Sequence, residues 1–153
     1  MDVLNFTIRV YGLLIKDGAV LISDEFQMGT RMSKFPGGGM EPGEGTLECL
    51  KRECMEEMGQ DVIVGRHFYT TDYFQPTMLV KPRAQLVSIY YLMELAMEPV
   101  FEISENAFEY GEDREGAQSF RWLKLQKELV DQISFPIDKG VFMSLCNEGI
   151  RNS

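Results

Sequence analysis

Cysteines and long apolar runs are scarce in this sequence. Its 153 residues include three cysteines, Cys49, Cys54 and Cys146, whose spacing does not suit a metal site and indicates reduced thiols in a cytosolic protein. No stretch approaches the roughly 20 apolar residues of a membrane span. The first segment, MDVLNFTIRVYGLLI, has neither the basic start nor the small-residue cleavage site of a signal peptide. We therefore expect a cytoplasmic location and no membrane contact.

Basic residues are also few. Fifteen lysines and arginines stand against 24 aspartates and glutamates, which gives a net charge of −9. Such a surface repels a polyphosphate backbone, so we do not expect duplex nucleic acid as a partner. The single histidine, His67, falls in a predicted strand, where we favour a structural role over metal binding or base catalysis.

Strand and helix signals alternate along the single domain that we predict for residues 1–153. A chain of this length can bury its own core, and we find no internal repeat. Periodicity and turn residues predict strands at 3–15, 19–23, 62–69, 85–95 and 119–123, and helices between 45 and 59, over 125–133 and from 136 onward. Residues 24–34 are interpreted as a polar connection. This alternation predicts an α/β protein.

Three carboxylates share one face of the first predicted helix. At about 100° per residue, Glu56 and Glu57 lie roughly 60° to one side and roughly 40° to the other side of Glu53. Like charges at these spacings repel, so a positive partner is expected to offset them. A hard cation such as Mg²⁺ or Mn²⁺ binds carboxylate oxygens and also accepts phosphate oxygens. For such a cluster taken alone, a solvated acidic face is the alternative.

A glycine segment leads into this helix. Gly37, Gly38 and Gly39 allow backbone groups to approach a metal or a phosphate closely, although a tight turn alone is the alternative. Gly45 or Thr46 is expected to cap the helix, and with Gly45 as the cap Glu48 falls at the third helical position. Gly59 is expected to end the helix. One apolar stripe is predicted to pack on the sheet: Leu47, Leu50, Cys54 and Met58.

Together these residues form a recognisable motif. From Gly38 the chain has five residues, Glu44, seven residues, Arg52-Glu53, two residues, Glu56-Glu57, one residue and Gly59. This order resembles the Nudix box at every polar and glycine position, and the chain is thus similar to Nudix hydrolases. Gln60 stands where the family has an apolar residue, which affects local packing rather than catalysis. The resemblance implies an α/β/α sandwich with a mixed β-sheet.

The resemblance also implies an activity, which is metal-dependent hydrolysis of the diphosphate linkage in a nucleoside diphosphate linked to another group. A nucleoside triphosphate, as in MutT-type enzymes, and an ADP-ribose-like compound are both kept as substrates. Mg²⁺ or Mn²⁺ is the expected cofactor, with Glu53, Glu56, Glu57 and the Gly38 carbonyl as its ligands. The alternative function is a non-catalytic nucleotide-binding sensor on the same fold.

The remaining roles follow from the same resemblance. Glu57 or Glu56 is expected to act as the base, and Arg52 to orient carboxylates, with Glu44 in a supporting or purely structural part. Relatives often add a loop carboxylate, for which we choose Glu115; a solvated surface acid is the alternative.

Four further residues are expected to meet the substrate. Arg31 and Lys34 lead into the glycine segment and could contact phosphate oxygens, whereas Tyr73 and Phe74 lie in an irregular segment, residues 70–83. We interpret this segment as a substrate-facing loop, and a core-covering loop or a subunit contact is the alternative. The expected partner is a small nucleotide-type molecule, and the sequence leaves a homodimer open.

Overall fold

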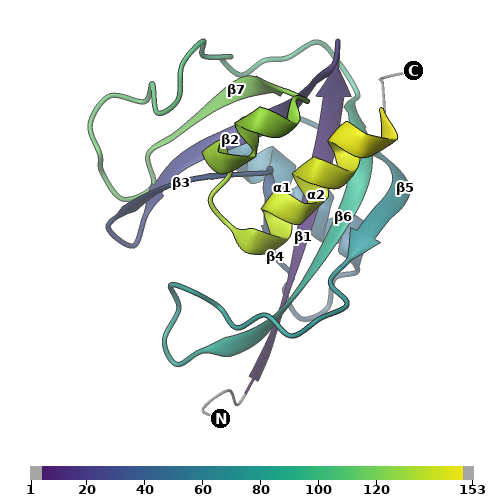
Figure 1. The fold of residues 1–153 in the computed structure, drawn as a ribbon, viewed down its shortest axis with the longest axis vertical. Helices are drawn as coiled ribbons and strands as arrows, with labels where there is room; N and C mark the ends of the chain where they lie inside the picture. The colour runs from purple at the N-terminus through teal and green to yellow at the C-terminus, as the bar shows by residue number, and fades with distance from the viewer. Residues whose placement is uncertain (1–4, 150–153) are drawn as a thin grey trace.

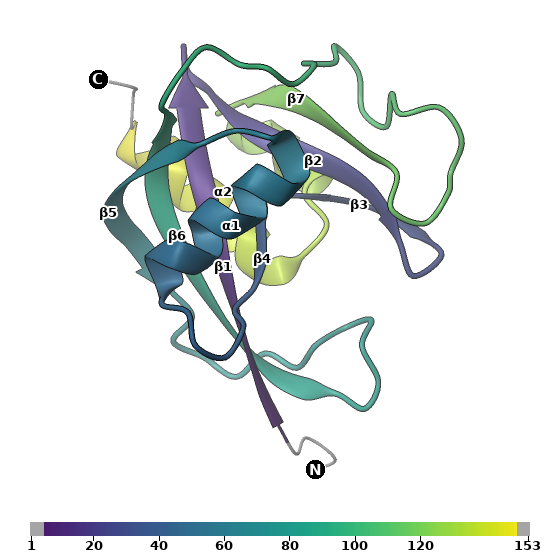
Figure 2. The ribbon, with the colours of Figure 1, turned by 180° about the vertical axis from the view of Figure 1, so that it is seen from behind.

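The computed structural model describes residues 5–149 and places a mixed β-sheet between two helices (Figure 1). Helix α2 (Pro136–Glu148) covers one face of the sheet. Helix α1 (Thr46–Met58) covers the opposite face, as the view from behind in Figure 2 shows. The predicted α/β fold, an α/β/α sandwich with a mixed sheet, is thereby confirmed.

Strand β1 (Asn5–Lys16) runs through the middle of the sheet. It pairs in parallel with β6 (Ala84–Leu95), and β5 (Val62–Thr70) joins β6 in antiparallel fashion. Antiparallel pairs link β1 to the short strand β4 (Gly37–Gly39) and to β2 (Ala19–Gln27). Strand β2 also pairs with β3 (Thr30–Lys34) and with β7 (Gln118–Lys124). The β1–β4 pairing places the glycine segment against the centre of the sheet.

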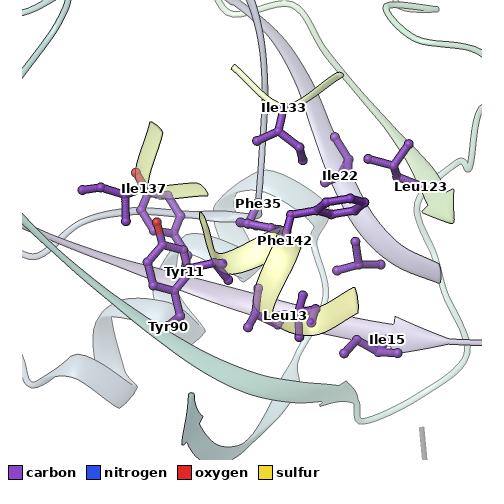
Figure 3. Packing of buried hydrophobic residues seen from close by; sticks show 13 residues of the cluster. Tyr11, Leu13, Ile15, Ile22, Phe35, Tyr90, Leu123, Ile133, Ile137 and Phe142 are labelled. Carbon is purple, nitrogen blue, oxygen red and sulfur yellow. The ribbon is translucent and has the colours of Figure 1, made fainter. Parts of the chain in front are cut away.

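Alternation along β1 divides the core between the two faces. Val10 and Leu14 point toward α1, whereas Tyr11 and Leu13 point toward α2, because successive side chains of a strand face opposite ways. The α2 side contains the larger cluster, in which Phe142 packs among strand residues (Figure 3). Fully burying one such side chain stabilises the fold by roughly 1.5–3 kcal/mol. Both helices are therefore fixed to the sheet by apolar contact.

The predicted polar connection over residues 24–34 is wrong, because this stretch is a β-hairpin. Strand β2 continues to Gln27, a turn at Met28 and Gly29 follows, and β3 begins at Thr30. Apolar alternation is missing here because the buried side chains are polar and paired. Asp24, for example, is fully buried and accepts a hydrogen bond from Arg121 at 2.7 Å.

Two details of the predicted helices are also corrected. Residues 125–133 contain a 3₁₀-helix, η1 (Lys127–Gln132), rather than an α-helix. In α1, Leu47 is 48% exposed, and Cys49 lies in the buried stripe in its place. The expected cap is confirmed: Glu48 accepts a hydrogen bond from the Gly45 amide at 2.9 Å, and Gly59 ends the helix in a left-handed conformation.

Gln60, the residue that departs from the Nudix box, is buried, and both polar atoms of its side chain form hydrogen bonds. Its side chain donates to the carbonyls of Met97 and Glu98, both at 3.3 Å, and accepts from the Val100 amide at 2.9 Å. A polar residue can therefore pack here because the segment after β6 supplies its partners. Of the first predicted strand, residues 3 and 4 lie outside the described residues. Within residues 5–149, neither helix has the length and apolar character needed to span a membrane.

Candidate active site

A cavity of about 490 Å³ lies where β1, β4, α1 and the start of α2 meet. Its charged lining includes Arg9, Lys34, Glu53 and Glu57, and a largely apolar part of the lining comes from residues 75–80. The cavity is large enough for a small molecule, and its size falls in the range usual for ligand sites. Two of the three predicted metal-binding glutamates, Glu53 and Glu57, thus line one cavity.

Glycine is required at two positions where the glycine segment meets α1. A Cβ atom on Gly38 would lie 2.5 Å from Cδ of Glu53, so any side chain would displace that carboxylate. Gly37 has a φ of 140°, and a Cβ there would meet the Val10 carbonyl oxygen at 2.1 Å. The Gly37 amide also donates to Glu57 Oε2 at 3.0 Å. The segment therefore holds both carboxylates by close backbone contact.

Arg52 gathers the other acidic groups beside this contact. Its guanidinium donates twice to Glu44, at 2.7 and 2.9 Å, and once to Glu53 at 3.0 Å. It also contacts Glu56, four residues along the helix, at 3.2 Å. A further hydrogen bond of 2.9 Å reaches the Gly39 carbonyl. The hydrogen bonds from Arg52 lower the pKa of Glu44 to about 2, so Glu44 stays charged and supports Arg52.

Lys34 lies in the cavity wall between two carboxylates. Its ammonium is 3.0 Å from Glu25 and 3.8 Å from Glu57, and it donates to the Gly37 carbonyl at 3.3 Å. Burial alone would lower the pKa of Lys34, but the two carboxylates outweigh burial and raise it above its ordinary value. Gln118 completes the group by donating to both Glu25 and Glu57. Lys34 thus holds Glu57 in place.

Glu57 has an unusual environment for a carboxylate. Desolvation raises its pKa to about 7, even though Lys34 and the Gly37 amide act in the opposite direction. A carboxyl group of this kind exchanges a proton near neutral pH, as a general base must.

Glu25 is a residue of the site that was not predicted, because it lies in the stretch interpreted as a polar connection. The turn at Met28 and Gly29 is the sequence signal that could have revealed Glu25 as part of a strand. In the β2–β3 register Glu25 pairs with Met32, and Lys34 lies two residues further along the same face. A hairpin prediction would therefore have brought Glu25 and Lys34 together.

Arg31 and Glu115, both predicted to act in the site, form contacts away from the cavity. Arg31 pairs with Asp113 at 2.9 Å and does not line the cavity. Glu115 accepts hydrogen bonds from the backbone amides of Met28 and Gly29, at 2.9 and 2.6 Å. Glu115 therefore stabilises the hairpin turn, and Arg31 joins β3 to the loop that contains Asp113. Neither contacts Glu53 or Glu57 among the described hydrogen bonds and ion pairs.

Three other predicted site residues, Tyr73, Phe74 and Glu56, lie outside the cavity lining. Tyr73 and Phe74 are about half exposed and do not line the cavity, whereas the next six residues, 75–80, do. The side chain of Glu56 is 59% exposed and is paired with Arg52 outside the cavity lining. His67 contacts Thr70 within β5 and is likewise outside the lining.

The donors present suit a hard divalent cation. Within the described part of the chain, no three acidic, histidine or cysteine side chains already converge as a cluster. The close contact between Gly38 and Glu53 nevertheless leaves no room for a side chain and joins a backbone strand to a carboxylate. Carboxylate and carbonyl oxygens are the ligands that Mg²⁺ and Mn²⁺ prefer. Glu53, Glu57 and Gly38 therefore fit such an ion.

Comparison with known proteins gives a family match. A model of the NUDIX domain matches residues 5–143. No curated protein sequence matches the chain.

Similar solved structures cover nearly the whole chain. They include a MutT protein from Methanosarcina mazei Go1, with a TM-score of 0.68 and 16% identity over 96% of this chain and 97% of that one. A NUDIX hydrolase from Nitrosomonas europaea has a TM-score of 0.69 and 17% identity, over 95% and 72%. An ADP-ribose pyrophosphatase from Streptococcus suis has a TM-score of 0.62 and 16% identity, over 96% and 93%. At such low identity these likenesses show a shared fold.

Proposed function

Because the chain belongs to the Nudix hydrolase family, we propose that its cavity hydrolyses the diphosphate linkage of a nucleoside diphosphate joined to another group, with Mg²⁺ or Mn²⁺ as cofactor. Nucleotide-linked diphosphate hydrolysis is the general activity of the family. The observation that carries the proposal for this site is the pair Glu53 and Glu57, which line the cavity from α1 and contact Gly38 and Gly37. A nucleoside triphosphate and an ADP-ribose-like compound are both substrate candidates.

The family match also supports one domain over residues 1–153, since it spans residues 5–143. In this domain Glu53, Glu56, Glu57 and the Gly38 carbonyl would hold the cation. When bound, the ion neutralises charge on phosphate oxygens and supplies Lewis acidity. The protein supplies positioning, which is the larger part of catalysis in phosphoryl transfer.

Among the candidates for the base we favour Glu57. It lines the cavity, whereas Glu56 does not, and burial raises its pKa to about 7. Lys34 and the Gly37 amide fix the carboxylate and so aim it at a water molecule that attacks the linkage. Arg52 keeps Glu53 and Glu56 from repelling each other. Arg52 thus acts on the site through the carboxylates that it orients.

The loop over residues 70–83 is proposed to contact the part of the substrate beyond the diphosphate. Its cavity-lining residues are Gln75, Pro76, Thr77, Met78, Leu79 and Val80. Tyr73 and Phe74 lie directly before them, so their contact with substrate depends on how the loop closes over it. Met78 and Val80 are about half exposed, which leaves apolar surface for a base or sugar to cover.

A nucleotide panel tests this function. The protein is incubated with nucleoside triphosphates and ADP-ribose-like compounds, and release of phosphate, pyrophosphate or a nucleoside monophosphate is measured with Mg²⁺, with Mn²⁺ and in EDTA. We expect metal-dependent turnover of at least one compound. Glu57→Gln is expected to lower turnover by about a hundredfold or more while the protein stays folded, because base and metal contributions have that size.

Glu94→Gln is the matched control, because Glu94 is exposed on β6 and outside the cavity lining. Full turnover in EDTA, or equal rates for Glu57→Gln and wild type, would refute the proposed mechanism. A nucleotide that binds without turnover under every metal condition would instead favour the sensor function.

A further inference from the structure

Arg9 is a cation in the cavity wall that forms no salt bridge among the described residues, although the carboxylates of Glu53 and Asp138 act on it from a longer distance. It lies on β1 opposite Gly39 of β4 and is partly buried. Its Nε donates to the Tyr11 hydroxyl at 2.5 Å, and its guanidinium lies 5.7 Å from the centre of the Tyr11 ring. Among the described residues, no carboxylate lies within 4.0 Å of it. Both Nη groups are therefore free to bind something else.

Two other cations beside the cavity, Lys34 and Arg52, are already paired with acids. Lys34 is neutralised by Glu25 and Glu57, so its ammonium has no free charge to offer a ligand. Arg52 is occupied by Glu44, Glu53 and Glu56. A partly desolvated guanidinium without a salt bridge is an uncommon arrangement, because burying an unpaired charge costs free energy. An anion from outside the chain would supply the close partner that Arg9 lacks among the described residues.

Tyr11 fixes the direction of this guanidinium. The Tyr11 ring is buried and stacks on Tyr90, with ring centres 5.4 Å apart. Figure 3 shows the two rings side by side with both hydroxyl oxygens on the side of Ile137. The Tyr90 hydroxyl in turn donates to Asp138, so the pair is tied to α2. Because Nε is held by Tyr11, the end of Arg9 that carries the two Nη groups stays available.

This end lies close to the catalytic groups. A Cβ on Gly39 would be 3.7 Å from Nη1 of Arg9, and the neighbouring residue of the same strand, Gly38, contacts Glu53. Arg9 and Glu53 therefore flank the same glycine strand. A phosphate group placed beside Glu53 would have its oxygens within the reach of the Arg9 fork.

We propose that Arg9 is a phosphate-binding residue of this site, whose Nη groups bind oxygens of the substrate diphosphate, and that Tyr11 is the positioning residue that holds it. The proposal rests on the proposed function and adds the residue that recognises the anion. A guanidinium suits this task because its planar fork makes two parallel, charge-assisted hydrogen bonds to phosphate.

The test measures binding of inorganic pyrophosphate in the presence of Mg²⁺ by calorimetry, without any turnover. We expect Arg9→Gln to weaken binding by about tenfold to a hundredfold, the size of lost charge-assisted hydrogen bonds. Arg9→Lys keeps the charge without the fork and should lose at least several-fold. Arg66→Gln removes the same charge from β5, outside the cavity lining, and should bind as wild type does.

Tyr11→Phe tests the positioning role through a double-mutant cycle. Removing the hydroxyl should weaken pyrophosphate binding in the wild-type background and add nothing in the Arg9→Gln background, because no guanidinium is left to hold. An equal loss in both backgrounds would overturn the role of Tyr11. Thermal unfolding of each variant verifies the fold. If Arg9→Gln fails to fold, the pyrophosphate affinity of Arg9→Lys tests the role of Arg9.

The proposal is overturned by wild-type protein that does not bind pyrophosphate, or by equal affinity of the Arg9 variants and wild type. These outcomes differ from failure of the proposed function. A protein that hydrolyses no nucleotide yet loses pyrophosphate affinity on replacement of Arg9 would refute the activity and leave the anion site standing.

Discussion

At the scale of single residues, Lys34 balances the negative charge of two buried carboxylates in the site, Glu25 and Glu57. A lysine that is almost entirely buried is rare unless it is paired, and Lys34 has two carboxylate partners. Without its ammonium, Glu25 and Glu57 would face each other in a region of low polarity. The same lysine therefore serves the fold and keeps the proposed base in position.

Lys34→Met should consequently destabilise the protein. Removing one partner of a buried ion pair leaves uncompensated charge, so we expect the free energy of unfolding to fall by about 3 kcal/mol. Urea denaturation measures this change. Lys124→Met, at the exposed end of β7, is the control and should stay within about 0.5 kcal/mol of wild type. Equal stability of Lys34→Met and wild type would contradict the pairing.

At the scale of elements, β4 and α1 act as one unit, because a strand of three glycines lies directly against the carboxylates of the helix. No φ in the left-handed region is involved at Gly38, so its need for glycine comes from space alone. The contact can therefore be disturbed without unfolding the strand.

Gly38→Ala should act mainly on the cation. The added methyl group would meet Glu53 at 2.5 Å, and the carboxylate has to move. We expect Mn²⁺ affinity to fall by about tenfold or more, as is usual when ligand orientation is lost. Titration of Mn²⁺ binding by proton relaxation measures this without a substrate. Gly140→Ala in α2 is the control, since nothing lies within 4 Å of its Cβ position. Unchanged affinity in Gly38→Ala would exclude Glu53 as a ligand.

Much of this unit could be predicted from the sequence, because its information is local. Glu53, Glu56 and Glu57 lie within five residues, and helical geometry alone places them on one face. The β2–β3 hairpin could not be found in this way. The buried carboxylate of Asp24 has its partner, Arg121, far along the chain, and only the tertiary structure shows that these charges are matched.

The loop over residues 70–83 shows a second reason why part of the site could not be predicted from the sequence. Tyr73 and Phe74 attract attention as aromatics, but residues 75–80 line the cavity, because an irregular segment has no period from which its inward face can be read. Glu115 is one of several neighbouring acids, and the turn amides of Met28 and Gly29 that bind it are 87 and 86 positions away in the chain. Long-range contacts of this kind determine which acid is used.

At the scale of the whole molecule, the sheet and α2 are joined through a buried acid. Asp138 in the first turn of α2 accepts a hydrogen bond from Tyr90 of β6 and is 3% exposed. Burial raises its pKa from 3.8 to about 6. Between these two pKa values the folded protein keeps a proton on Asp138, whereas the unfolded chain loses it.

The stability of the sandwich should depend on pH accordingly. Below the unfolded pKa both states are protonated and no cost arises. As pH rises toward the folded pKa, the unfolded chain ionises first, so the free energy of unfolding falls, by about 3 kcal/mol for a shift of this size. Asp138→Asn should lack this loss between about pH 4 and pH 7 in urea denaturation. Asp131→Asn, an exposed acid of η1, should keep it. Identical pH profiles for wild type and Asp138→Asn would refute the assignment.

The parallel pairing of β1 with β6 has a consequence for biosynthesis. Val10 pairs with Ile89, so the first strand leaves the ribosome long before its neighbour exists. At roughly 5–20 residues per second, the delay is about 4–16 seconds. During that time the edge of β1 that pairs with β6 has no partner strand, and such high contact order slows folding and favours aggregation. Because β1 also carries Arg9 and the start of α2 supplies one wall of the cavity, a nascent chain gains its binding site only after α2 has been synthesised.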